Sequence, residues 1–172
     1  GGYFALRAAA FEPRVARVIA SGHAFDYTKV TRGTWLLTFF RDHFREFTNR
    51  VARWQIRRGG LEAWNISHLM YVLNVDEPMA GLDFALGMNE GNLCSDRVSQ
   101  DVLILASRED HFIPFRLHAK QLARLTAARS VTDRVFTRAE HAHNHCQIGN
   151  IGLALRVMKE WIAEISESSG PP

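Results

Sequence analysis

Two polar residues stand where an acid and a base could work together. Asp110 ends the polar stretch 107–110 that follows the apolar run 102–106, and His145 follows a second β-type run, 131–137. In open parallel sheets, ligands bind beyond the carboxyl ends of the strands. A carboxylate there can accept the Nδ1 proton of a histidine, fix its tautomer and stabilise the imidazolium that forms in catalysis. The pair predicts acid–base support for a nucleophile, in the chain order acid and then base.

Each member of the pair has another interpretation when taken alone. Asp110 lies four residues before Pro114, where an aspartate often caps a turn. His145 has competitors for its role, because three further histidines lie in the same two loops: His111, His141 and His143. The alternation of histidines in 141–145 is also typical of a metal-binding strand, and imidazole suits zinc, copper or nickel. No cysteine or carboxylate completes a recognisable ligand set, so we expect no metal and no cofactor.

The elements that must position these residues follow from apolar patterning. Strands are predicted at 17–20, 102–106 and 131–137, and core helices at 3–12, 115–128 and 151–165. Strands alternating with helices imply right-handed crossovers and a parallel sheet. The predicted fold class is therefore α/β. Three strands make at most half a sheet, so we expect the apolar edge to pair with a missing N-terminal half of the same fold or to promote self-association.

Residues 23–99 follow a different, helical rhythm. One aromatic amphipathic helix is predicted from six residues: Trp35, Leu36, Phe39, Phe40, Phe44 and Phe47. Further helices are predicted at 51–56, at 61–73 and, as a short one, at 83–88. Such aromatic stripes are usually core, and some of these side chains could also line an apolar substrate pocket. The expected organisation is a core segment 1–22, a helical lid 23–99, a second core segment 100–165 and a polar tail 166–172.

Composition excludes several classes of function. The chain has 172 residues, 47% of them hydrophobic, which is enough for a real core. A net charge of +3 with scattered basic residues argues against nucleic-acid binding. No apolar run reaches the roughly 18 residues that span a bilayer. Two cysteines, Cys94 and Cys146, fit a reducing compartment, so a cytoplasmic location is expected.

Several stretches together resemble a known family. Residues 101–114, 136–138 and 144–150 are similar to the C-terminal half of α/β-hydrolase-fold enzymes, particularly bacterial esterase-like members. Gly1-Gly2 matches the end of the Gly-x-Ser-x-Gly-Gly nucleophile elbow, which implies a serine two residues before Gly1. The resemblance covers both flanks, 1–22 and 100–165, while the segment between them resembles a lid only by its position.

The resemblance implies a role for particular residues. It makes His145 the general base, Asp110 its acid partner and Gly1 the elbow glycine. Glu109, beside Asp110, and Asp26, where some relatives place their acid, are the alternative acids.

The implied activity is hydrolysis of a small ester-like substrate, at an ester, a related acyl bond or a carbon–carbon bond in a diketone. This chain alone is expected to be inactive because it lacks the nucleophile. Two other functions stay open: a non-catalytic binding module, and a parent protein with an aspartate nucleophile of the dehalogenase type.

Overall fold

The computed structural model describes residues 1–30 and 33–168. It contains two compact units. The sheet unit comprises Gly1–Asp26 and the chain from Glu90 onward, and the helical unit comprises Tyr27–Asn89. The helical unit is thus shorter than the predicted segment 23–99, because residues 23–26 and 90–99 pack with the sheet.

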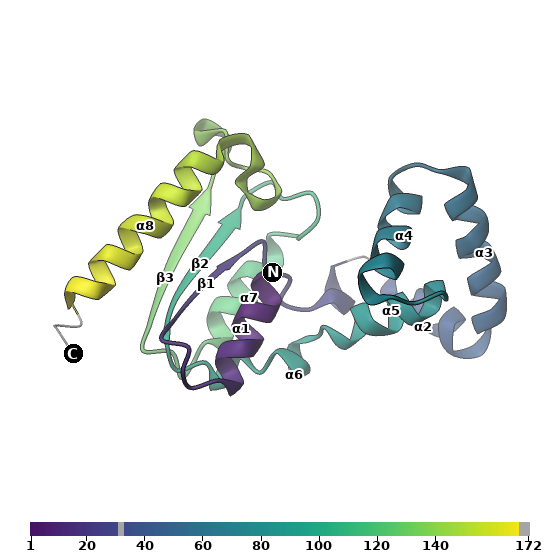
Figure 1. Ribbon diagram of the computed structural model, residues 1–172, viewed down its shortest axis with the longest axis horizontal. Coiled ribbons are helices and arrows are strands. Elements are labelled where there is room, and N and C mark those ends of the chain that lie inside the picture. The colour runs from purple at the N-terminus through teal and green to yellow at the C-terminus, as the bar shows by residue number, and fades with distance from the viewer. Residues whose placement is uncertain (31–32, 169–172) are drawn as a thin grey trace. The chain divides into compact units, whose positions relative to one another are not determined.

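Three parallel strands form the sheet, in the order β1-β2-β3 (Figure 1). They are β1 (Arg17–Ser21), β2 (Asp101–Ser107) and β3 (Ser130–Phe136). The central strand β2 is buried along its whole length, as its continuous apolar run predicts for a strand covered on both faces. The parallel α/β class predicted from the sequence is confirmed. All three carboxyl ends lie at one edge, which is where Asp110 and His145 follow.

Helices cover both faces of this sheet. In Figure 1, α8 (Ile151–Ser168) lies along one face, while α1 (Gly2–Phe11) and α7 (Arg116–Arg124) lie on the other. The α8 side holds a buried cluster: Leu103, Leu105, Phe136, Ala142, Ala154 and Trp161. Alternation along β2 sends Val102 and Ile104, also fully buried, to the opposite face. The sheet is therefore held by two apolar layers, one on each side.

Short elements complete the sheet unit. They are α6 (Glu90–Leu93) and the 3₁₀ turns η2 (Ser95–Arg97), η3 (Arg138–Glu140) and η4 (His145–Asn150). Helix α7 ends before the predicted 128 because Leu125, at ψ 51°, leaves the helical region. Helix α8 continues to Ser168, so the start of the predicted tail 166–172 is helical. Residues 169–172 of that tail lie outside the described residues.

In its described residues, 27–30 and 33–89, the helical unit contains a 3₁₀ turn, η1 (Tyr27–Lys29), and four helices. These are α2 (Thr34–His43), α3 (Arg45–Arg58), α4 (Leu61–Leu73) and α5 (Pro78–Gly87). The helix predicted through Phe47 is broken at Phe44, whose φ of −137° and ψ of 40° are not helical. Helix α4 begins and ends as predicted, whereas α5 starts earlier than 83, with Pro78 at its first turn.

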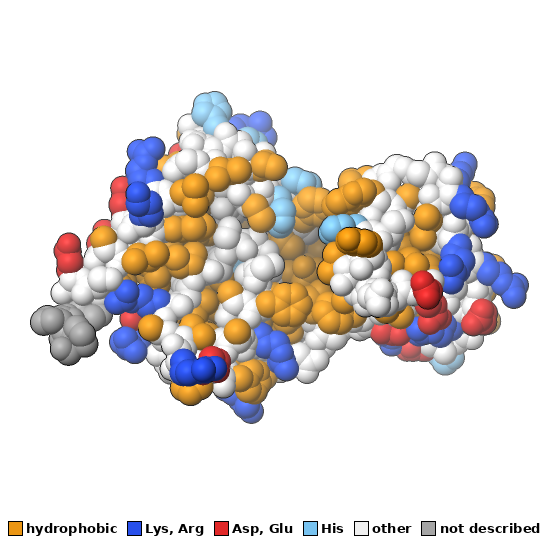
Figure 2. Space-filling model, viewed as in Figure 1, with side chains coloured by type: hydrophobic (Ala, Val, Ile, Leu, Met, Phe, Trp, Pro, Cys, Tyr) orange, Lys and Arg blue, Asp and Glu red, His pale blue; other side chains and the backbone are white. Residues whose placement is uncertain are grey.

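The apolar residues that predicted one long amphipathic helix are mostly not buried within the helical unit. Five of the six that predicted an amphipathic helix are exposed, led by Trp35 at 74%. In Figure 2, apolar side chains are visible on this unit's surface among arginines and acidic residues. These five residues are therefore not part of a core within the helical unit. Among the helices of the described ranges 1–30 and 33–168, none combines the length and apolar character needed to cross a bilayer.

Candidate active site

Asp110 and His145 meet at the carboxyl edge of the sheet. The Nδ1 atom of His145 lies 2.8 Å from Oδ2 of Asp110. Because an ionised carboxylate only accepts hydrogen bonds, this contact places the imidazole proton on Nδ1 and leaves Nε2 as an acceptor. The Asp110 side chain is 6% exposed and that of His145 is 28% exposed. The histidine is thus oriented by a buried acid while its ring remains accessible.

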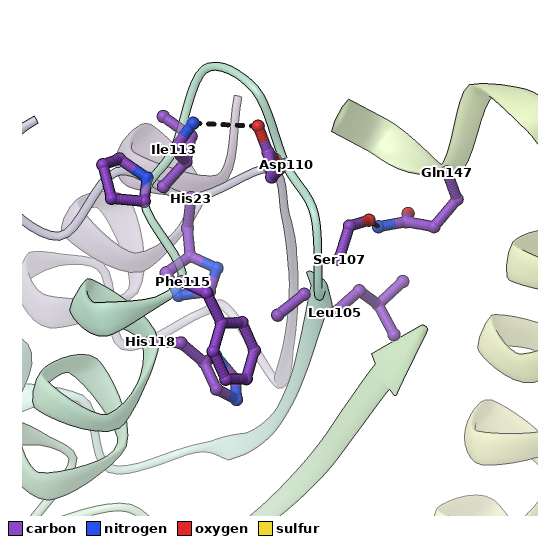
Figure 3. Close-up of a pocket in the computed structure, with 11 residues that line it drawn as sticks. His23, Leu105, Ser107, Asp110, Ile113, Phe115, His118 and Gln147 are labelled. Carbon is purple, nitrogen blue, oxygen red and sulfur yellow. Dashed lines mark hydrogen bonds between the residues drawn. The ribbon is translucent and has the colours of Figure 1, made fainter. Parts of the chain in front are cut away.

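Backbone groups hold the acid in place. Oδ1 of Asp110 accepts hydrogen bonds from the N–H groups of Phe112 and Ile113, each at 2.8 Å (Figure 3 shows the second). Burial opposes the charge on this carboxyl. The hydrogen bond from His145 and the two backbone donors outweigh that burial, so the pKa of Asp110 lies below its usual value. Asp110 therefore caps the turn and orients His145 at the same time.

The ring of His145 is packed as well as hydrogen bonded. The Phe112 ring meets it edge-on at 5.0 Å between centroids, from the loop that carries Asp110. On another side lies Gly22, at the end of β1. A Cβ at Gly22 would come within 3.2 Å of Cε1 of His145 and 2.8 Å of Sγ of Cys146, and its φ of +58° favours glycine. The β1 end therefore needs a glycine for the histidine loop to lie against it.

Two contacts tie the acid loop to the histidine loop. The N–H of Glu109 donates to the carbonyl oxygen of His143 at 2.9 Å. The carboxylate of Glu109 forms a two-pronged ion pair with Arg138, which lowers the pKa of Glu109. Glu109 therefore engages an arginine rather than His145. These contacts fix the separation of the two loops, on which the Asp110–His145 hydrogen bond depends.

Comparison with known proteins supports a fold assignment. No protein family model matches the sequence. A curated protein, "Hydrolase acrC" of Aspergillus aculeatus, is 34% identical over 87 residues, which cover 45% of this chain and 19% of that protein. The crystal structure of 2,6-dihydroxy-pseudo-oxynicotine hydrolase matches 94% of this chain with a TM-score of 0.57 and 20% identity. The chain has the α/β-hydrolase fold. It covers 36% of that solved chain.

Asp26, the alternative acid predicted from the sequence, is not the carboxylate that the structure pairs with His145. Asp26 is buried. The pKa of Tyr3 is raised mainly by burial of its phenol, and the charges of Cys94 and Asp26 make smaller contributions in the same direction. The acid that reaches His145 is Asp110.

The remaining histidines of the two loops do not replace His145. The His111 ring is exposed, with its centroid 6.1 Å from that of His145. His141 is exposed in a left-handed conformation, and Nδ1 of His143 is buried without a hydrogen-bond partner. Across the described residues, no group of three or more His, Cys, Asp or Glu side chains is arranged to hold a metal ion.

The two N-terminal glycines differ in their surroundings. Gly1 precedes α1, and a Cβ there would meet no atom within 4 Å. A Cβ at Gly2 would lie 2.7 Å from the carbonyl oxygen of Ser21 and 2.8 Å from Cβ of His23. The need for a glycine is therefore steric at Gly2, where α1 passes the end of β1. This contact also puts the start of α1 at the carboxyl end of β1.

Polar residues beneath the two loops were not predicted from the sequence. A small cavity there is lined in part by His23, Ser107, His118 and Gln147 (Figure 3). His23 and Ser107 each stand at or just beyond the end of a predicted strand, the same signal that selected Asp110, but neither was assigned a role at this edge. Nothing in the pattern around Gln147 or His118 distinguishes these residues from ordinary loop and helix positions. Only the structure shows that all four side chains are buried beneath the loops that carry Asp110 and His145.

Proposed function

We propose that this chain supplies the acid and the base of a Ser-His-Asp triad in a serine hydrolase. In this proposal His145 is the general base, Asp110 orients it, and a serine two residues before Gly1 is the nucleophile. The serine attacks an acyl carbonyl, and His145 takes its proton and returns it to the leaving group. Asp110 stays ionised and stabilises the imidazolium.

One observation carries the proposal: the 2.8 Å contact from His145 Nδ1 to a buried Asp110. An aspartate that only capped its turn would not need a histidine beside it. Here Oδ1 of Asp110 accepts the two backbone hydrogen bonds of the turn, and Oδ2 lies within hydrogen-bond distance of the His145 ring. The same contact leaves Nε2 of His145 free of the Asp110 carboxylate, and Nε2 is the atom that accepts the proton of a hydroxyl in a triad. The order of the two residues, acid and then histidine, agrees with the chain order of α/β-hydrolase triads and supports the proposal.

The nearest thiol does not supply the nucleophile in this proposal. Cys146 adjoins His145, but partial burial and the charge of Asp110 raise the pKa of its thiol. A thiol with a raised pKa carries little thiolate, the reactive form. The position of Gly2 against the end of β1 instead brings the residues before α1 to the active edge. A nucleophile from that side would approach His145 from the direction that a strand-to-helix elbow provides.

The substrate class follows from the same chemistry. An acyl–enzyme mechanism accepts an ester, a related acyl bond or a carbon–carbon bond beside a carbonyl. The solved relative is named for 2,6-dihydroxy-pseudo-oxynicotine, so this compound belongs in the assay panel. The helical unit, residues 27–89, is proposed to act as a lid.

The test uses the full-length protein and an activated ester such as p-nitrophenyl acetate. We expect His145→Ala and Asp110→Asn each to lower kcat by at least about a thousandfold, since the second variant stabilises the wrong tautomer. His141→Asn, which alters an exposed histidine of the same loop and tolerates its positive φ, is the matched control and should keep wild-type kcat. Undiminished turnover by His145→Ala would refute the proposal.

Two other results would identify the alternatives. Halide release from haloalkanes by a protein with aspartate in place of the serine would show a dehalogenase-type parent. Ligand binding with no turnover on the ester panel would show a binding module. This chain without its preceding residues is expected to give no turnover in any of these assays, because His145 has no hydroxyl to activate.

A further inference from the structure

The turn after His145 is strained. Cys146 (φ 52°, ψ 26°) and Gln147 (φ 53°, ψ 33°) are consecutive residues in the left-handed region. Side chains with a Cβ crowd the following carbonyl there, and two such residues in succession are unusual outside glycine and asparagine. Strain of this kind persists only when surrounding contacts enforce it, and it concentrates at functional sites.

The side chain of Gln147 makes such contacts. It is 1% exposed and lies beneath the loop, between the ends of two strands. Its Oε1 accepts a hydrogen bond from the hydroxyl of Ser21, the last residue of β1, at 3.1 Å. Its Nε2 donates to Oγ of Ser107, the last residue of β2, at 2.9 Å (Figure 3). Gln147 thus joins the two strand ends directly below the histidine loop.

The network continues to the other side of the loop. The hydroxyl of Ser107 donates to the carbonyl oxygen of Ala142 at 3.2 Å. Because the Ser107 hydroxyl donates its proton to the Ala142 carbonyl, its oxygen can act only as an acceptor toward Gln147. The side-chain amide of Gln147 donates that hydrogen bond. Ala142 and Gln147 flank His145 in sequence, so one buried network anchors the loop on both sides. An amide is suited to this place because it accepts at one end and donates at the other.

We propose that Gln147 is a positioning residue for His145. Its buried amide holds the left-handed turn at residues 146 and 147 and thereby keeps Nδ1 of His145 within hydrogen-bond distance of Asp110. Gly22 supports the same arrangement, because its missing side chain lets the turn lie directly on the end of β1. The catalytic meaning of this role rests on the function proposed above, whereas the geometric role does not.

The experiment replaces Gln147 by methionine, which keeps the length and removes both polar ends. Gln121→Met is the matched control, since Gln121 is also fully buried and bonded to a serine, Ser95, with no hydrogen bond to the histidine loop. Each full-length variant is examined in two ways. NMR of the imidazole detects the Nδ1 proton held by Asp110, and ester hydrolysis gives kcat and KM separately.

We expect Gln147→Met to lose the low-field Nδ1 proton signal and to lower kcat by about a hundredfold, the loss typical of a catalytic group misplaced by about 1 Å. KM should change little, because the network lies below the loop, and Gln121→Met should retain the signal and kcat. Ser21→Ala removes only the bond to Oε1 and should weaken the same signal, so it serves if Gln147→Met does not fold.

The two proposals fail differently. If His145→Ala keeps full activity, the proposed function is wrong, and the NMR signal still decides the role of Gln147. If His145→Ala is inactive but Gln147→Met and Ser21→Ala both keep the Nδ1 signal, the positioning role is wrong. Equal losses in Gln147→Met and Gln121→Met would also overturn it, because they would reflect general destabilisation.

Discussion

Buried His23 should make the sheet unit lose stability in mild acid. The His23 side chain is 4% exposed, its Nδ1 has no hydrogen-bond partner, and its ring lies 5.7 Å from that of His118. Burial, and then the neighbouring His118, lower the pKa of His23 from 6.5 to about 4, although the charge of Asp110 acts in the opposite direction. In the unfolded chain the same imidazole takes up its proton near its ordinary pKa.

The size and direction of the effect follow from linkage. Between pH 6.5 and about 4 the unfolded state binds the proton and the folded state does not, so the free energy of unfolding falls as the pH decreases. Above pH 6.5 the His23 imidazole is neutral in both the folded and the unfolded state, so its full contribution to the free energy of unfolding is present. At about 1.4 kcal/mol per pKa unit, the full loss is about 3 kcal/mol by pH 4 and about 2 kcal/mol by pH 5.

Urea unfolding at pH 7 and pH 5 measures this loss. The indole Nε1–H of Trp161, which donates to Thr132 inside the sheet unit, is a suitable NMR reporter for that unit. We expect the wild type to lose about 2 kcal/mol more between the two pH values than His23→Gln, which cannot titrate. His68→Gln, an exposed histidine of the helical unit, should behave like the wild type. Equal acid sensitivity of wild type and His23→Gln would refute the reasoning.

Two further substitutions test the packing that positions the site. Gly22→Ala adds a Cβ within 3.2 Å of the His145 ring at a positive φ, so we expect ester hydrolysis by the full-length protein to fall at least about tenfold; unchanged kcat would show that the loop yields freely. Leu103→Ala empties part of the layer between β2 and α8, and should lower the free energy of unfolding by about 2–5 kcal/mol. Urea denaturation measures that change, and a loss below about 1 kcal/mol would contradict the assigned core.

The sequence pattern predicted an element reliably where many of its residues favour the same secondary structure and the same burial. Continuous apolar character along β2 predicts a central parallel strand because every side chain in it favours burial. The break between α2 and α3 at Phe44 could not be predicted in the same way. The apolar spacing continues through Phe44 to Phe47, and neither glycine nor proline marks the end of a helix there. A single non-helical residue interrupts the helix without disturbing the pattern that predicts it.

The choice among four loop histidines shows why the site was only partly predictable. His111, His141, His143 and His145 have the same side chain and lie in the same two loops, so residue type cannot distinguish them. What selects His145 is the backbone: the carbonyl of His143 is held by Glu109, and Gln147 fixes the turn that follows. These are single polar contacts between segments far apart in sequence, and each depends on strand ends that exist only after the sheet has formed. The apolar pattern therefore determines the edge at which the histidine lies, and a few buried hydrogen bonds determine which histidine meets the acid.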